Sequence, residues 1–427
     1  MFLGASSEAF STTTMMADQQ TLQAASSGKA RLRIAIDARC ILPQEDGLGT
    51  YARNLLRELA RLDHPHQLIV LVRAEARREL ASLEEPGRFE LLETDIPSMK
   101  ASQHVRVPLV LRRLEPDVYH YLAHDAPILH RVPTVTTVQD MNYLTFSDYY
   151  STWRLLKKVY SYLVSRLSVG YAKHVMVPSE ATRSLLVARW PWVDPRVTVV
   201  PYGVHERYQK ECEPEALQAV LDQHGLELER YFLFVGTDRP HKNLHRMVDA
   251  FAQLPDTLRS SLQLAVAGAH RYGTSFRSSE SLPAGLRSLG YVPTEHLPAL
   301  YRGALAFVMP SLGEGFGLPA LEAMTVGSPV IVSRGTSLEE VVGDAGLVVD
   351  PTSTESITEA MTAVATNEVL RERLVRSGQK RSRRFSFEET ARSALSIYEA
   401  IGSKEDVSSP VGLDEDRRFS RPDTKAT

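Results

Sequence analysis

Residues 311–333 read SLGEGFGLPALEAMTVGSPVIVS, a stretch that indicates a phosphate-binding βα unit of a parallel sheet. A Gly-Phe-Gly loop at 315–317 leads into Pro319, a residue that favours the first turn of a helix. Such a loop presents backbone N–H groups and the positive end of the helix dipole to an anion. The apolar run PVIVS that follows is typical of a strand covered on both faces. The stretch therefore predicts strands, helices and an anion site in one sheet.

Apolar strands alternate with amphipathic helices on both sides of this stretch, which predicts an α/β fold. We expect strands over 31–38, 66–74, 89–95, 117–123, 134–140, 174–179 and 197–204, and then over 231–237, 262–269, 288–293, 305–311, 329–333 and 346–351. A polar stretch over 206–229 divides the two sets. The pattern indicates two doubly wound, Rossmann-like domains facing a cleft, with ligands outside the carboxyl ends of the strands.

Length and composition agree with this division. A chain of 427 residues with 43% hydrophobic and 24% charged residues is an ordinary globular protein of two domains. We expect one Rossmann-like domain over 31–205, a second over 206–385 and a crossover helix over 386–402. Residues 1–30 and 403–427 are predicted to be a disordered extension and a disordered tail. The net charge of −3 gives no general attraction to nucleic acid, and the two separated cysteines fit a reducing cytoplasm.

Two glutamates and two cations are the main candidate site residues. Glu322 lies about one turn inside the helix that begins near Pro319, where its carboxylate can accept hydrogen bonds from ribose hydroxyls. Glu314 precedes the turn and is expected to face a transferred sugar. Arg239 and Lys242 follow the strand YFLFV in the segment GTDRPHKN and can converge on a diphosphate, whose growing negative charge they would stabilise. The backbone of Gly236 and Thr237 begins this segment, and that of Gly315, Phe316, Gly317 and Leu318 is expected to bind phosphate.

These motifs resemble those of the retaining, GT-B-fold glycosyltransferases of family 4, over nearly all of residues 31–401. Residues 311–333 resemble that family's glutamate-pair signature, and LFVGTDRPHKNLHRMVDAF its donor-phosphate motif. SLGYVPTEHLPALYRGA, which contains Val292, resembles the base-binding segment. DGLGTYARNLLREL resembles the amino-terminal glycine loop, so Gly47 and Gly49 are expected to close on the sugar or its phosphate. The resemblance implies a hexosyltransferase whose carboxy-terminal domain holds a nucleotide-diphosphate sugar and whose amino-terminal domain holds the acceptor.

The sequence departs from the family at two positions. Thr237 stands where many members have arginine, so Arg239 is expected to take that role. Gln139 and Asp140 stand where the family usually has His-Asp, and we place both on the acceptor side of the catalytic site. Glutamine can donate a hydrogen bond to a sugar but cannot exchange a proton near neutral pH. The family's mechanism does not require an enzyme base, because the departing phosphate can accept the acceptor's proton.

The resemblance makes GDP-mannose, UDP-glucose or a related compound the expected donor, and a polysaccharide or lipid-linked saccharide the expected acceptor. No cofactor or metal is expected, because Arg and Lys would do the work of a metal ion. Two alternatives stay open from the sequence. The protein is either a GT-B-fold enzyme of another kind, an epimerase or a phosphorylase, or a homologue that has lost activity. The basic and aromatic segment 152–174 indicates either a solvated helix packed on the first sheet or peripheral contact with the inner face of a membrane. His120, His124 and Asp125 at a strand end are either structural or directed at the cleft.

Overall fold

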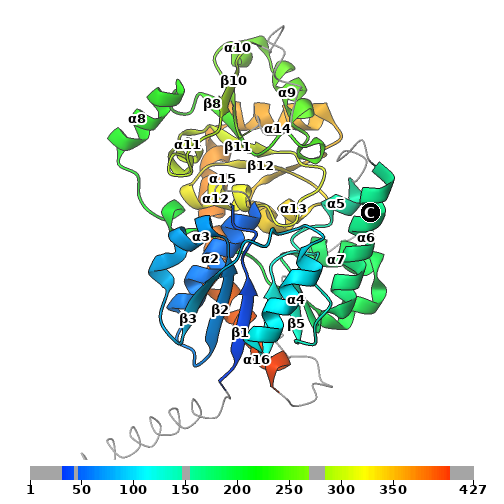
Figure 1. The fold of residues 1–427 in the computed structure, drawn as a ribbon. Helices are drawn as coiled ribbons and strands as arrows, with labels where there is room; N and C mark the ends of the chain where they lie inside the picture. The colour runs from blue at the N-terminus through cyan, green and yellow to red at the C-terminus, as the bar shows by residue number, and fades with distance from the viewer. Residues whose placement is uncertain (1–30, 43–46, 147–153, 269–283, 404–427) are drawn as a thin grey trace, which may run out of the picture.

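The computed structural model of the protein describes residues 31–42, 47–146, 154–268 and 284–403. The expected amino-terminal extension and all but the first residue of the expected tail lie outside these ranges. The chain forms two lobes, each built on one parallel β-sheet with helices around it (Figure 1).

The first sheet contains β1 (Arg33–Asp37), β2 (Gln67–Val72), β3 (Phe89–Glu93), β4 (Val118–Tyr121), β5 (Thr134–Thr137), β6 (His174–Val177) and β7 (Val197–Val199). The second contains β8 (Tyr231–Val235), β9 (Gln263–Ala267), β10 (Leu286–Gly290), β11 (Ala306–Met309), β12 (Val330–Ser333) and β13 (Leu347–Val349). Each strand overlaps one of the predicted strands, although β10 begins two residues before the predicted 288–293. The predicted α/β class is confirmed.

Strand order fixes where a ligand site can form. The first sheet has the order β3-β2-β1-β4-β5-β6-β7, and the second β10-β9-β8-β11-β12-β13. The order reverses between β1 and β4 in the first sheet and between β8 and β11 in the second. Loops at the carboxyl ends of two such strands diverge to opposite faces and leave space between them. The loops after β8 and β11 carry the two motifs with Lys242 and Glu314.

The α-helices of the first lobe are α2 (Gly47–Arg61), α3 (Ala74–Leu80), α4 (Gln103–Leu114), α5 (Asn142–Thr145), α6 (Arg154–Tyr171) and α7 (Glu180–Arg189). Those of the second are α8 (Pro214–His224), α9 (Leu244–Ala252), α10 (Asp256–Arg259), α11 (Leu297–Gly303), α12 (Leu318–Val326), α13 (Ser337–Val342), α14 (Thr354–Thr366) and α15 (Glu368–Ser382). Short 3-10 turns are η1 (Ala81–Leu83), η3 (Pro191–Arg196), η4 (Glu206–Tyr208), η5 (Pro240–Lys242) and η7 (Gly343–Ala345).

The polar stretch over 206–229, for which the sequence predicted no element, contains a helix, α8. Pro214 occupies the first turn and Gly225 ends the helix with φ of 62°. These are the usual start and stop residues of a helix. The low apolar content of the segment hid them, because only Leu221 of α8 is fully buried.

The last helix, α16 (Phe387–Gly402), returns to the first lobe, as the crossover prediction expected, and packs against α2 and β4. Tyr398 and Nδ1 of His120 on β4 form a hydrogen bond of 2.6 Å. Glu399 lies 3.1 Å from Nε2 of His66, and Thr390 donates to the carbonyl of Pro201. Burial of apolar residues such as Ala391 and Ala394 on the same face fixes the helix there.

The lobes share one continuous apolar cluster at their junction. The ring of Tyr202, from the end of the first domain, lies 5.1 Å from that of Phe316 in the second. Phe316 also contacts Phe385, and Tyr202 stacks on Phe387 of α16. The junction therefore brings the loop 311–317 against the first domain.

Candidate active site

Lys242 and Glu314 meet at the switch point of the second sheet. Lys242 ends η5 after β8, and Glu314 lies in the loop after β11. Nζ of Lys242 donates to Oε1 of Glu314 at 2.7 Å, and the side chains are 17% and 10% exposed. In a pair of this kind each charge compensates the other, so both are tolerated away from water. The sequence predicted these two residues in one site, and the structure brings them together.

The glycine loop after Glu314 is held against the first domain. The carbonyl of Gly315 accepts hydrogen bonds from Ser179 at 2.7 Å and from Thr182 at 3.0 Å, both at the start of α7. A Cβ atom at Gly315 would lie 1.9 Å from the carbonyl oxygen of Gln139, so only glycine fits here. Gly317 has φ of 109° and precedes the first residue of α12. The loop therefore points the amino terminus of α12 at the junction between the domains.

The loop before α12 and the first residue of that helix retain donors that an anion would need. In the part of the chain that the structure describes, the N–H groups of Gly315, Phe316 and Leu318 donate to no backbone carbonyl. Leu318 begins the helix, whose first N–H groups have no intrahelical acceptor, and Gly315 and Phe316 precede it, so these donors are available to a phosphate. The Phe316 side chain packs in the apolar cluster at the junction and is only 5% exposed. Its predicted binding role is thus confined to its backbone.

Glu322 lies on the buried side of α12, 9% exposed, and its Oε2 accepts a hydrogen bond of 3.0 Å from Tyr301 on α11. Burial, together with the adjacent carboxylate, raises the pKa of Tyr301 well above its ordinary value. Tyr301 therefore remains a donor that orients Glu322. Val292, from the segment predicted to hold the base, is 7% exposed and belongs to the core between the two domains.

Asp140 and Gln139 face the glycine loop from the first domain, after β5. Burial raises the pKa of the Asp140 carboxyl, and the nearby carboxylate of Glu314 adds to this effect, while His124 and Lys242 oppose it. The Gln139 amide donates to the carbonyl of Leu122 at 3.1 Å and accepts from the Tyr202 hydroxyl at 2.6 Å. The pKa of Asp140 therefore depends on charges of the second domain, whereas the Gln139 side chain bonds within the first domain and orients Tyr202, which packs on Phe316.

Of the three candidate residues at the end of β4, His120 and Asp125 make contacts inside the first domain, whereas His124 lies near Asp140. His120 is fully buried between Tyr398 and Thr137, and burial lowers its pKa to about 3, so it is structural. Asp125 accepts hydrogen bonds from Tyr121 and Gln103 inside the first domain. His124 is close enough to Asp140 to oppose the rise in the pKa of that carboxyl, and its ring stacks on that of Tyr143 at 3.8 Å.

The remaining predicted residues lie at the start of α2 and in the segment that follows β8. Gly47 and Gly49 form the first turn of α2, so their description as a loop before that helix is wrong. One turn further, Tyr51 stacks on Tyr202 at 4.4 Å, which places the start of α2 beside the junction. Gly236, Thr237 and Arg239 lie in the loop between β8 and η5, the 3-10 turn that ends at Lys242. The N–H of Gly236 still donates to the carbonyl of Ala267 in β9. The convergence of Arg239 with Lys242 stays a prediction.

Several contacts between the domains were absent from the sequence prediction. Ser179, Thr182 and Asn142 bond to the carbonyls of Gly315 or Gly313 across the junction. His241 stacks on Phe146 at 5.8 Å, and burial lowers the pKa of its imidazole to about 4. Ser179 carries a signal, because Ser followed by Glu at a strand end is a typical helix cap. Its partner, the carbonyl of Gly315 in the other domain, could not be predicted from the residues around Ser179.

Comparison with known proteins supports this arrangement. The family model described as Glycosyltransferase Family 4 matches residues 46–207, and that described as Glycosyl transferases group 1 matches residues 221–381. The O-antigen chain mannosyltransferase B of Escherichia coli is 29% identical over 382 residues, which cover 83% of this chain and 96% of that protein. A phosphatidyl-myo-inositol mannosyltransferase of Mycobacterium leprae is 30% identical over 184 residues, 42% of this chain and 49% of the relative.

Solved structures show the same fold. WaaG, a glycosyltransferase involved in lipopolysaccharide biosynthesis, has a TM-score of 0.66 and 19% identity over 86% of this chain and 99% of its own. HepE of Anabaena, in complex with UDP and glucose, has a TM-score of 0.67 and 16% identity over the same shares. The first matched segment contains β2–β7 of the first sheet, and the second contains all six strands of the second sheet. The glutamate and lysine motifs meet near the junction of the two domains. The chain therefore belongs to the GT-B-fold glycosyltransferases, with a family 4 amino-terminal half and a group 1 carboxy-terminal half, and is an enzyme of the hexosyltransferase type.

Proposed function

We propose that the protein transfers a hexose from a nucleotide-diphosphate sugar to a glycan or lipid-linked saccharide, with retention of anomeric configuration. The observation that carries this proposal is the Lys242–Glu314 pair beside the amino terminus of α12, facing Asp140 of the other domain. In this proposal Lys242 and the N–H groups before α12 bind the diphosphate, and the carboxylates of Glu314 and Asp140 accept hydrogen bonds from the sugar hydroxyls.

The chemistry follows from these positions. The bond from the anomeric carbon to the diphosphate breaks, and the acceptor oxygen bonds to that carbon on the same face. The acceptor's proton passes to a phosphate oxygen of the leaving group, so no enzyme base is required. Lys242, Arg239 and the N–H groups of 315–318 stabilise the charge that grows on the diphosphate. Glu322 holds the ribose, and Glu314 orients the sugar when Lys242 turns to the phosphate.

The relatives narrow the substrate class. O-antigen chain mannosyltransferase B and the mycobacterial enzyme are both named for mannosyl transfer, and the second is named for a lipid acceptor. We therefore place GDP-mannose first among the donors and a UDP-hexose second. The acceptor is a growing polysaccharide or a lipid-linked saccharide at the cytoplasmic face of a membrane. Cys40 and Cys212, which form no disulfide, agree with a reducing compartment.

A panel of nucleotide sugars tests the donor. Each compound is added to the full chain in a thermal-shift measurement with EDTA, because a ligand of the folded state raises the melting temperature. The stabilising donor is then incubated with saccharide acceptors, and the product's anomeric configuration is read by NMR. A transferred sugar with the donor's configuration, formed without metal, supports the proposal. An inverted product, a metal requirement, or conversion of the donor without an acceptor contradicts the corresponding part.

A further inference from the structure

The surface formed by α4 and α6 has unusually many exposed apolar side chains. Val105 and Leu109 on α4, and Val159, Tyr160, Leu163 and Leu167 on α6, are between 43% and 62% exposed. Among the described residues, these six make up nearly half of the thirteen exposed large hydrophobic side chains, although α4 and α6 are only two of the helices. A concentration of this kind marks an interaction site, whereas single exposed apolar residues need no explanation.

The exposed residues form one stripe along each helix, and the stripes adjoin. Positions 105, 109 and 113 of α4 and positions 159, 163 and 167 of α6 repeat every four residues, so each set shares a face. The hydroxyl of Tyr160 and Nε2 of His104 lie 3.4 Å apart, which places the two helices next to one another. We call these two stripes, with their flanking arginines, the α4–α6 face.

The charged residues of the two helices are all cations. Neither α4 nor α6 has an aspartate or glutamate in its sequence. Arg106 of α4 pairs with Asp95, which lies outside the helix. Arg112, Arg113 and Arg166 are exposed beside the apolar stripes. This contrasts with the net charge of −3 for the whole chain. Helices with apolar and basic residues on one exposed surface bind the interface of anionic membranes.

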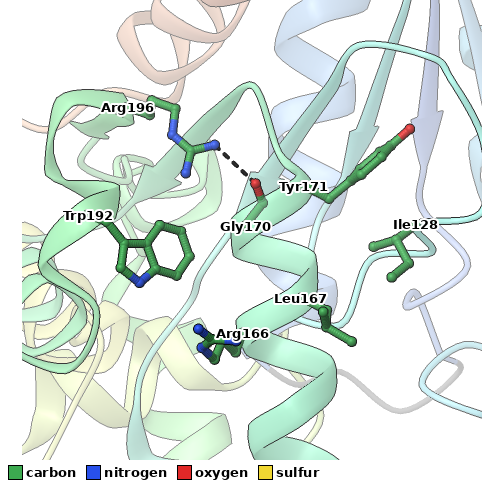
Figure 2. Close-up of a pocket in the computed structure, with 7 residues that line it drawn as sticks. All are labelled: Ile128, Arg166, Leu167, Gly170, Tyr171, Trp192 and Arg196. Carbon is green, nitrogen blue, oxygen red and sulfur yellow. Dashed lines mark hydrogen bonds between the residues drawn. The ribbon is translucent and has the colours of Figure 1, made fainter.

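A pocket of about 440 Å³ lies at the carboxyl end of α6 and extends the α4–α6 face (Figure 2). Its walls include Leu167, Tyr171 and Trp192, with Arg166 and Arg196 among them. The guanidinium of Arg196 lies 5.7 Å from the centre of the Trp192 ring and donates to the carbonyl of Gly170. Cations beside an apolar wall suit a lipid phosphate with its adjoining chain.

We propose that the α4–α6 face docks the enzyme on an anionic phospholipid bilayer. None of the described helices has the length and apolar character to cross a bilayer, so the contact is peripheral. The face belongs to the acceptor domain, and it therefore brings a lipid-linked saccharide to the domain expected to bind it. This last point rests on the proposed function, whereas the docking itself does not.

Sedimentation with lipid vesicles tests the docking. The full chain is mixed with vesicles of phosphatidylcholine and phosphatidylglycerol, or of phosphatidylcholine alone. We expect binding to the anionic vesicles, and a loss of about tenfold or more in the Leu163→Glu/Leu167→Glu variant. The matched control is Leu228→Glu/Val369→Glu, which alters residues of the second domain that are at least as exposed and should bind as the parent does. Absence of binding by the parent, or equal loss in both variants, overturns the proposal.

A second variant and a mass measurement separate loss of docking from loss of folding or of self-association. Arg112→Gln/Arg113→Gln changes only exposed polar residues, so it tests the face even if the glutamate variant has a lowered melting temperature. Light scattering reports the mass of each variant, and a parent dimer that becomes monomeric would assign the face to a second copy and overturn membrane docking. Transfer to a water-soluble saccharide should be unchanged in these variants. Vesicle binding without any transfer contradicts the proposed function alone, and transfer without vesicle binding contradicts the docking alone.

Discussion

Nζ of Lys242 lies 2.7 Å from Oε1 of Glu314, although 72 residues separate them in the chain. The strands that precede them, β8 and β11, are neighbours in the sheet, and the order of strands reverses between them. The pair therefore exists because of topology rather than local sequence. The ion pair also makes two half-buried charges tolerable in the absence of a diphosphate, because each charge compensates the other.

We expect Lys242→Met to reduce kcat/KM for sugar transfer by about 100-fold or more, because a cation that stabilises a leaving diphosphate acts mainly in the transition state. Glu314→Gln should reduce kcat more than it weakens donor binding. Steady-state kinetics with the donor identified by thermal shift check both. Lys210→Met, which removes an exposed lysine far along the chain from both loops, is the control. Unchanged turnover in both site variants would refute these roles.

We expect Gly315→Ala to abolish transfer while the protein stays folded. The new methyl group would lie 1.9 Å from the carbonyl oxygen of Gln139 and 2.9 Å from Cβ of Asp140, so the domains cannot approach as they do here. Small-angle scattering should show a larger radius of gyration, and the kinetic assay should show lost activity. Gly170→Ala is the control, because its methyl group meets only Trp192 at an ordinary 3.5 Å. A compact, active Gly315→Ala protein would contradict this account of the junction.

The fold followed from the sequence because each strand is a short apolar run, and burial on both faces of a parallel sheet demands such runs. The Lys242 and Glu314 motifs were also predictable, since each combines a strand end with a helix start. The roles of Gln139 and Phe316 were not, because both depend on Tyr202, a partner distant in sequence whose position only the closed junction determines. His124 was ambiguous for the same reason, since its direction relative to Asp140 has no local signature.

We expect Gln139→Leu to destabilise the protein by about 1–3 kcal/mol, because it leaves the buried Tyr202 hydroxyl without its acceptor. In the Tyr202→Phe background the same change should cost less, since the unpaired hydroxyl is gone. Urea unfolding of the four proteins measures this coupling. Additive losses would show that the 2.6 Å hydrogen bond contributes nothing to the junction.

We expect stability to fall with decreasing pH from about 6.5, and His120 to account for part of that slope. Burial lowers the pKa of His120 to about 3, so the folded protein keeps it neutral while the unfolded chain takes up a proton below its ordinary pKa. The stabilisation is therefore complete above the unfolded pKa and declines as pH falls toward the folded value, by up to about 1.4 kcal/mol per pH unit. His174 and His241, with pKa values lowered by burial to about 4, act in the same direction. Urea unfolding between pH 7 and pH 5 measures the slope, which His120→Gln should reduce and His245→Gln, at an exposed position on α9, should leave almost unchanged. An identical slope in His120→Gln would mean that this imidazole, held between Tyr398 and Thr137, is protonated in the folded enzyme after all.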